Sequence, residues 1–166
     1  AEPHDDIVKQ IENLAELISK PPHAIDRVGN KEVITIAVDV KISVVMELMA
    51  RTGYSNLPVY EDNKLLGVIN ARKLLNVLGN KVAEGVNLQE YIENTSVVDV
   101  VSLMGDDYFF VIADENLTID AAMNYFENNR KLMIILLTKD GKESGKPLGI
   151  ISHADIIDMK KILDIY

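Results

Sequence analysis

The pattern of apolar and polar residues begins with a segment of helical spacing near the N-terminus. Between Asp5 and Lys20, apolar side chains recur every three or four residues, at Ile7, Ile11, Leu14, Ala15 and Ile18. The Pro21-Pro22 pair ends this pattern, because the residue before a proline disfavours helical backbone. We therefore expect an amphipathic helix and linker over residues 1–23. The apolar face of this helix covers the core of the protein or packs against a partner chain or an upstream domain.

The rest of the chain carries one hydrophobic pattern twice. The matching segments are Ile42–Met49 with Ile119–Phe126, Leu57–Val59 with Ile134–Leu136, and Leu66–Ile69 with Leu148–Ile151. An insertion within the turn-rich segment Lys139–Pro147 lengthens the second copy. Self-similarity of this kind indicates a structural repeat.

Each copy predicts a β-α-β-β-α unit, in which strands alternate with amphipathic helices. In the first copy the expected strands are Val33–Val38, Leu57–Tyr60 and Leu65–Ile69, with a closing helix at Ala71–Leu78. In the second copy they are Tyr108–Ala113, Met133–Thr138 and Leu148–Ile151, with a closing helix at His153–Leu163. Asp62-Asn63-Lys64 is short enough to join two antiparallel strands.

A single unit of this kind leaves one face of its sheet uncovered, and two packed units bury both faces. We therefore expect a mixed α/β (α+β) fold of two β-α-β-β-α repeats packed as a pseudo-twofold pair, with an extra N-terminal helix. The expected boundaries are 24–80 for the first repeat, 81–94 for a linker and 95–166 for the second repeat.

Composition narrows the classes of partner. A formal net charge of −9 repels phosphodiester backbones and anionic lipid, so we expect no nucleic-acid partner. The longest apolar runs, such as Leu132–Leu137, are far below the ~20 residues of a membrane helix. The absence of cysteine fits a reducing compartment, and we expect a cytoplasmic protein without a metal site. The chain begins with Ala1 rather than Met, which is consistent with a fragment of a longer protein.

The sequence offers little for catalysis. It contains no cysteine nucleophile and no glycine-rich phosphate loop, and its three histidines are isolated from one another. His153 follows Ser152, but neighbours at a strand-to-helix junction usually point apart. We therefore expect that the protein is not an enzyme.

One stretch of the second repeat carries a recognisable motif. Gly149-Ile150-Ile151-Ser152-His153-Ala154-Asp155 resembles the ligand signature of the CBS domain family, Gly-x-hydrophobic-Ser/Thr-x-x-Asp. Gly53–Val59 and Leu66–Ile69 of the first repeat also resemble the family, so the similarity covers most of the chain. The resemblance implies a pair of CBS domains that acts as a regulatory sensor and forms a homodimer or controls an effector domain. It implies an adenosine-type ligand, such as adenosine, AMP or S-adenosylmethionine, and no required cofactor.

The chemistry of the motif supports this ligand class. Ser152 lies where a strand gives way to a helix, where a hydroxyl can cap the helix or contact a ligand. Asp155 lies on the same helix face, and its carboxylate can accept hydrogen bonds from both hydroxyls of a ribose. The alternative is purely structural, since a serine and an aspartate also stabilise a helix N-terminus.

The family's adenosine pocket adds further positions by resemblance. In this sequence they are Asp106 and Val111 at the first strand, and Lys131 and Leu132 before the second strand. A backbone edge at Val111 would read the adenine, and Leu132 with Met133 would cover its ring. The alternatives are core packing for the apolar residues and a solvated charge for Lys131. His153 lines the pocket or lies on the surface.

The first repeat departs from the motif, because Asn70 and Lys73 stand where the hydroxyl and the carboxylate belong. Lysine has no acceptor for a ribose, so this site is expected to be degenerate or to hold an anion through Arg72 and Lys73. The alternative is that both are exposed helix charges. The rival to a ligand sensor is a ligand-free module for oligomerisation or protein interaction.

Overall fold

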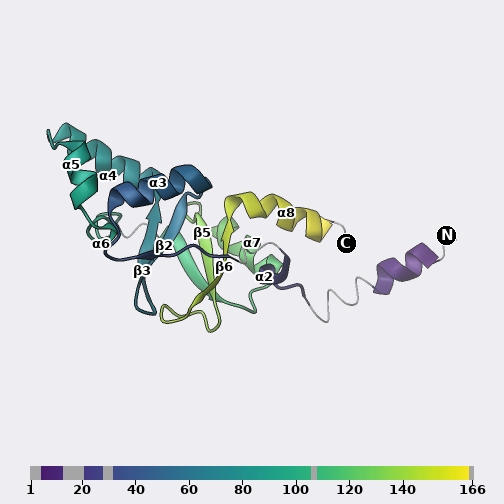
Figure 1. Ribbon diagram of the computed structural model, residues 1–166. Helices are drawn as coiled ribbons and strands as arrows, with labels where there is room; N and C mark the ends of the chain where they lie inside the picture. Colours follow the sequence, from purple (N-terminus) through teal and green to yellow (C-terminus); the bar gives the residue numbers. More distant parts are fainter. Residues whose placement is uncertain (1–4, 13–20, 28–31, 106–107, 165–166) are drawn as a thin grey trace. The chain divides into compact units, whose positions relative to one another are not determined.

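Two three-stranded sheets, each with its own set of helices, form the fold (Figure 1). The structure, a computed structural model, describes residues 5–12, 21–27, 32–105 and 108–164. Residues 5–12 are helical, and their side chains are exposed. This agrees with the expected N-terminal helix, whose remaining part lies outside the described residues.

The first sheet has the strand order β1-β2-β3. It comprises β1 (Ile36–Ala37), β2 (Asn56–Glu61) and β3 (Lys64–Asn70). β1 runs parallel to β2, whereas β2 and β3 form an antiparallel hairpin. Asp62 in the connecting turn adopts a positive φ of 52°, a conformation that Asp tolerates better than most residues.

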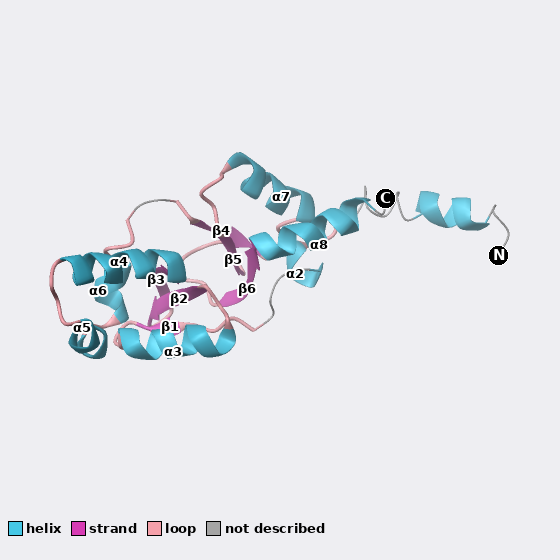
Figure 2. Cartoon of the chain, turned by 90° about the horizontal axis from the view of Figure 1, so that it is seen from above, coloured by secondary structure: helices cyan, strands magenta, loops and turns pink. Residues whose placement is uncertain are grey.

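The helices packed with this sheet are α3 (Ile42–Thr52), α4 (Ala71–Ala83), α5 (Leu88–Asn94) and α6 (Val97–Val101), as Figure 2 shows. Val45 of α3, Val77 of α4 and Val100 of α6 share one core with Leu57 and Ile69 of the sheet. Alternating side chains of a strand point to opposite faces, and this alternation directs Leu57 and Val59 of β2 into the same core.

The second sheet repeats the arrangement in the order β4-β5-β6. It comprises β4 (Phe110–Asp114), β5 (Ile134–Thr138) and β6 (Pro147–Ser152), with helices α2 (Ala24–Arg27), α7 (Ile119–Asn128) and α8 (His153–Asp164). The β4–β5 pair is parallel and the β5–β6 pair antiparallel, as in the first sheet. The predicted β-α-β-β-α order is therefore confirmed for both repeats.

The two units do not coincide with consecutive stretches of the chain. Residues 1–33, 109–142 and 147–166 form one unit, and residues 34–108 with 143–146 form the other. Ala24 donates its N–H to the carbonyl of Leu117, close to α7. Val97 of α6 donates its N–H to the carbonyl of Val40, close to α3. The segment that precedes each repeat's first strand thus packs in the unit of the other repeat.

Most elements differ from the expected bounds by one or two residues at an end, and two segments differ more. The strand expected at Val33–Val38 is paired only at Ile36–Ala37, because beyond it the carbonyls of Val38 and Val40 accept the N–H groups of Val98 and Val97. Residues 81–94, expected as a linker, contain the end of α4 and the whole of α5. In the described parts of the chain, no helix has the length and apolar character needed to span a membrane.

Candidate functional site

The junction between β6 and α8 places the central residues of the motif. β6 ends at Ser152 and α8 begins at His153, so Asp155 lies in the first turn of the helix. Ser152 is aligned with Ile134 of β5, which is aligned with Phe110 of β4. One end of the sheet therefore brings together the end of β6 and the beginnings of β4 and β5.

Ser152 and Asp155 are joined by two hydrogen bonds. The Ser152 N–H donates to Asp155 Oδ2 at 2.7 Å, and the Ser152 hydroxyl donates to the same oxygen at 3.2 Å. The carboxylate thus caps the start of α8, whereas the sequence suggested the serine hydroxyl for that role. Both bonds end on Oδ2, and both side chains are only partly buried, so Oδ1 stays outside this pair of bonds. The arrangement supports the helix and keeps one carboxylate oxygen for another donor.

His153 lies beside this pair and is exposed. Its ring lies 5.0 Å from that of Phe126 on α7, at a tilt of 53°. Of the two positions expected for His153, this favours the surface.

The residues before β5 divide between core and surface. Leu132 is fully buried in the core between the second sheet and its helices. Lys131 is exposed, which agrees with a solvated charge. Met133 is partly exposed, and its N–H donates to the carbonyl of Phe109 at 2.7 Å. Of these residues, Met133 is therefore the better placed to cover a ligand.

The direction of the β4 backbone follows from the same bond. The Phe109 carbonyl faces β5, where it also accepts the Ile134 N–H at 3.3 Å. Backbone groups alternate between the two edges of a strand, so those of Val111 also face β5, and those of Phe110 and Ile112 face the outer edge. The Val111 side chain packs against the core. Asp106, the other residue expected near this strand, lies outside the described residues.

The equivalent junction of the first repeat is built differently. Asn70 is buried, caps α4 by accepting the Lys73 N–H at 3.1 Å, and donates to Asn56 Oδ1 at 2.7 Å. The Lys73 ammonium group donates to the carbonyl of Met104 at 3.0 Å. Lys73 is thus a half-buried anchor rather than an exposed helix charge, whereas Arg72 is exposed. Neither Asn70 nor Lys73 supplies a carboxylate at this junction.

Sequence reasoning missed the partners of these residues. Asn56 lies opposite Asn70 in the β2–β3 register, so aligning the hairpin strands would have found that pair. Met104 and Phe126 carry no comparable signal, because their contacts with Lys73 and His153 depend on the packing of distant segments. Among the described residues, no group of three or more His, Asp or Glu side chains is arranged to hold a metal ion.

Comparison with known proteins identifies a family match in both repeats. The model of the CBS domain family matches residues 15–80 and 97–161. Inosine-5'-monophosphate dehydrogenase of Thermoplasma acidophilum is 30% identical over 134 residues, which are 81% of this chain and 23% of that enzyme. The chain thus spans less than a quarter of the length of this curated relative.

Solved structures share the fold at low sequence identity. CBSX2 in complex with AMP has a TM-score of 0.60 and 19% identity, with 87% of this chain and 98% of that chain covered. The CBS domain of a bacterial CNNM/CorC family Mg²⁺ transporter in complex with ATP has a TM-score of 0.61 and 20% identity. That match covers 90% of this chain and 92% of the transporter domain.

Proposed function

The chain belongs to the CBS domain family, and on this premise we propose that it is a regulatory, non-catalytic module that binds an adenosine-type ligand mainly at its second repeat. The observation that carries the proposal is the contrast between the two strand-to-helix junctions. The second repeat presents the Asp155 carboxylate beside Ser152, whereas the first presents Lys73, which already bonds to Met104.

The carboxylate suits a ribose for a simple chemical reason. A ribose diol offers two hydroxyl donors, and an ionised carboxylate only accepts. Asp155 Oδ2 is held by Ser152, so Oδ1 has a defined direction from which to accept a ribose hydroxyl. Because the carboxylate is fixed before the ligand arrives, little side-chain entropy is lost on binding.

The base would lie toward the beginning of β4. The sheet ends at this strand, and the outward backbone groups of Phe110 and Ile112 can supply a donor and an acceptor to an adenine edge. We assign Met133 to the ring face, because Leu132 is fully buried. We keep three further residues as proposed neighbours of the site: Asp106, Lys131 and Val111. His153 would lie at its exposed edge.

The solved relatives support the ligand class without identifying the ligand. AMP is bound by one of these relatives and ATP by another. The segment Lys131–Met133 of this chain carries one exposed lysine and no arginine or histidine for phosphates. We therefore favour adenosine, AMP or S-adenosylmethionine over a nucleotide with several phosphates.

A thermal-shift screen tests this function. Adenosine, AMP, ADP, ATP and S-adenosylmethionine are each added at millimolar concentration, because a ligand that binds only the native state stabilises it by RT ln(1 + [L]/Kd). A rise in Tm with at least one of adenosine, AMP and S-adenosylmethionine supports the proposal. If none of the five compounds raises the Tm, the interaction-module alternative becomes the better account.

Exposed apolar side chains on the helices favour a homodimer, whether or not the module binds a ligand. Leu75 on α4 is 69% exposed, and Ile157 on α8 is 63% exposed. We propose that such faces pair between two copies of the chain in the cytoplasm, where ligand binding would alter contacts with an effector domain. Sedimentation at micromolar concentration that finds only an 18.5 kDa species would exclude the dimer.

A further inference from the structure

The turn between β5 and β6 contains the insertion that lengthens the second repeat, and its last residues pack with the first sheet. Residues Glu143–Lys146, here called the strap, belong by their contacts to the unit of β1, β2 and β3. The Glu143 carbonyl accepts the N–H of Leu65 at 2.8 Å, and the Gly145 carbonyl accepts the hydroxyl of Tyr60 at 3.2 Å. Tyr60 as a whole is 9% exposed, and its hydroxyl bond to Gly145 is partly buried.

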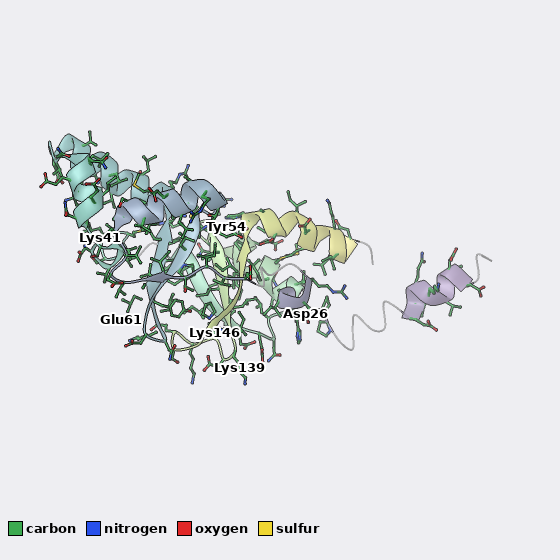
Figure 3. All side chains as sticks on the ribbon, viewed as in Figure 1. Asp26, Lys41, Tyr54, Glu61, Lys139 and Lys146 are labelled. Carbon is green, nitrogen blue, oxygen red and sulfur yellow. The ribbon has the colours of Figure 1, made fainter. Side chains whose placement is uncertain are left out.

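The first half of the turn contacts β4 and β5. The buried Thr138 donates its hydroxyl to the carbonyl of Lys142 at 3.3 Å, and Asp140 Oδ1 accepts the Lys142 N–H at 3.1 Å. Gly141 has a φ of +72°, and a Cβ added there would lie 3.2 Å from the backbone nitrogen of Asp114. The turn is thus fixed at both halves, which suits it to transmit a displacement. Figure 3 labels Lys139 and Lys146 at its two ends.

Strand β6 joins the strap to the candidate ligand site. Pro147 follows the strap directly, and Ser152 ends the strand, so the two features lie at opposite ends of six residues. At ~3.3 Å per residue, this strand spans about 17–20 Å. Pairing with β5 runs from Ile134↔Ser152 to Leu137↔Gly149, and after a β-bulge at Leu148 it ends with Thr138↔Pro147.

We propose that the strap couples the site at Ser152 and Asp155 to the β2–β3 hairpin through β6, an inference that rests on the proposed function. A ligand that bonds to the Asp155 carboxylate changes the hydrogen bonds at the end of β6. The strand, paired with β5 on both sides of the bulge, carries that change to the Tyr60 and Leu65 bonds. Such coupling is reciprocal. If bound ligand stabilises the hydrogen bonds of the strap by some factor, then loosening those bonds must lower the ligand affinity by the same factor.

The experiment follows the exchange rate of the Leu65 amide by NMR. The internal reference is the Ala71 amide, which donates to Ser55 at 2.8 Å near the other end of β3. The measured quantity is the ratio of the Leu65 to the Ala71 exchange rate. Without ligand, Asp155→Ala is expected to raise this ratio. Asp158→Ala, a change at an exposed residue of the same helix, is expected to leave the ratio unchanged. Saturating AMP is expected to slow Leu65 exchange in the native protein.

Calorimetry with AMP provides the reciprocal measurement. Tyr60→Phe is expected to weaken AMP binding about fivefold, the lower end of typical coupling between sites, and Tyr54→Phe, at an exposed tyrosine, is expected to have no effect. If Asp155→Ala speeds Leu65 exchange but no adenosine compound binds, the coupling through the strap is supported and the proposed function fails. If AMP binds and neither Asp155→Ala nor AMP alters the Leu65 ratio, the proposed function stands and the strap coupling is wrong.

Discussion

The ammonium group of Lys73 lies 3.0 Å from the carbonyl oxygen of Met104, and this lysine occupies the position that Asp155 holds in the second repeat. The side chain of Met104 is buried in the first core, so the bond fixes the chain just beyond α6. In the first repeat, the position equivalent to Asp155 thus holds a side chain that bonds within the protein. Two copies of one scaffold have diverged in chemistry at the same place.

Replacing Lys73 with Met should therefore lower stability. The change removes a charged donor from a half-buried carbonyl, and such bonds are worth about 1.5–3 kcal/mol. Because Lys73 is partly exposed, we expect about 1–2 kcal/mol in urea unfolding. Arg72→Met is the matched control, expected within about 0.5 kcal/mol of the native protein. Equal stability of the two variants would contradict the anchor.

Replacing Asp155 with Ala should weaken an adenosine-type ligand by about 1.5–3 kcal/mol, or about ten- to a hundredfold, through the loss of charged hydrogen bonds. The measurement is calorimetry with the compound that raises the Tm most, at a temperature where all variants are folded. Native protein is expected to bind about one ligand per chain, since the first repeat lacks the carboxylate. Lys73→Ala should leave the affinity nearly unchanged. Loss of binding in Lys73→Ala with full binding in Asp155→Ala would assign the site to the first repeat.

We expect the protein to lose stability in alkaline solution through ionisation of Tyr60. Burial raises the pKa of Tyr60 above its ordinary value of 10.0, because the phenolate is poorly solvated there. A raised pKa in the folded state means that the stabilisation is complete below pH 10 and is lost as the pH rises through the folded pKa. Urea unfolding at pH 8 and above pH 10 measures the loss. Tyr60→Phe should reduce this alkaline loss while costing about 1 kcal/mol at pH 8; an unchanged alkaline loss would exclude Tyr60 as its source.

Two glycines should respond in opposite directions to alanine. A Cβ at Gly67 in β3 would lie 2.7 Å from Val101 Cγ1, so Gly67→Ala is expected to destabilise by about 1–3 kcal/mol through overpacking. Gly79 in α4 has no atom within 4 Å of its added Cβ, and alanine favours a helix over glycine by about 1 kcal/mol. Gly79→Ala is therefore expected to raise the Tm, and Gly67→Ala to lower it. A Tm for Gly67→Ala that is unchanged or raised would show that the β3–α6 contact is looser than described, and a lowered Tm for Gly79→Ala would contradict the helix-propensity gain.

The repeat architecture was predictable from the chain, because the features that specify it are local. Helical spacing in Ile42–Met49 and the short turn after Glu61 determine element type and hairpin pairing within a few residues of each other. The Ser152–Asp155 bonds are equally local, since the two residues lie three apart at a strand-to-helix junction. This is why both the order of elements and the pairing of Ser152 with Asp155 agree with the sequence pattern.

The remaining features depend on residues that meet only after folding. Ala24 bonds to Leu117, Lys73 to Met104, and Tyr60 to Gly145 across 85 residues of sequence. No local periodicity encodes these contacts, because each partner's position is decided by how whole strands and helices pack. Composition and spacing therefore determined the two repeats and the carboxylate at Asp155. Tertiary packing decided which segment each core includes, that Lys73 is an anchor rather than a free charge, and that the inserted turn packs with the first sheet.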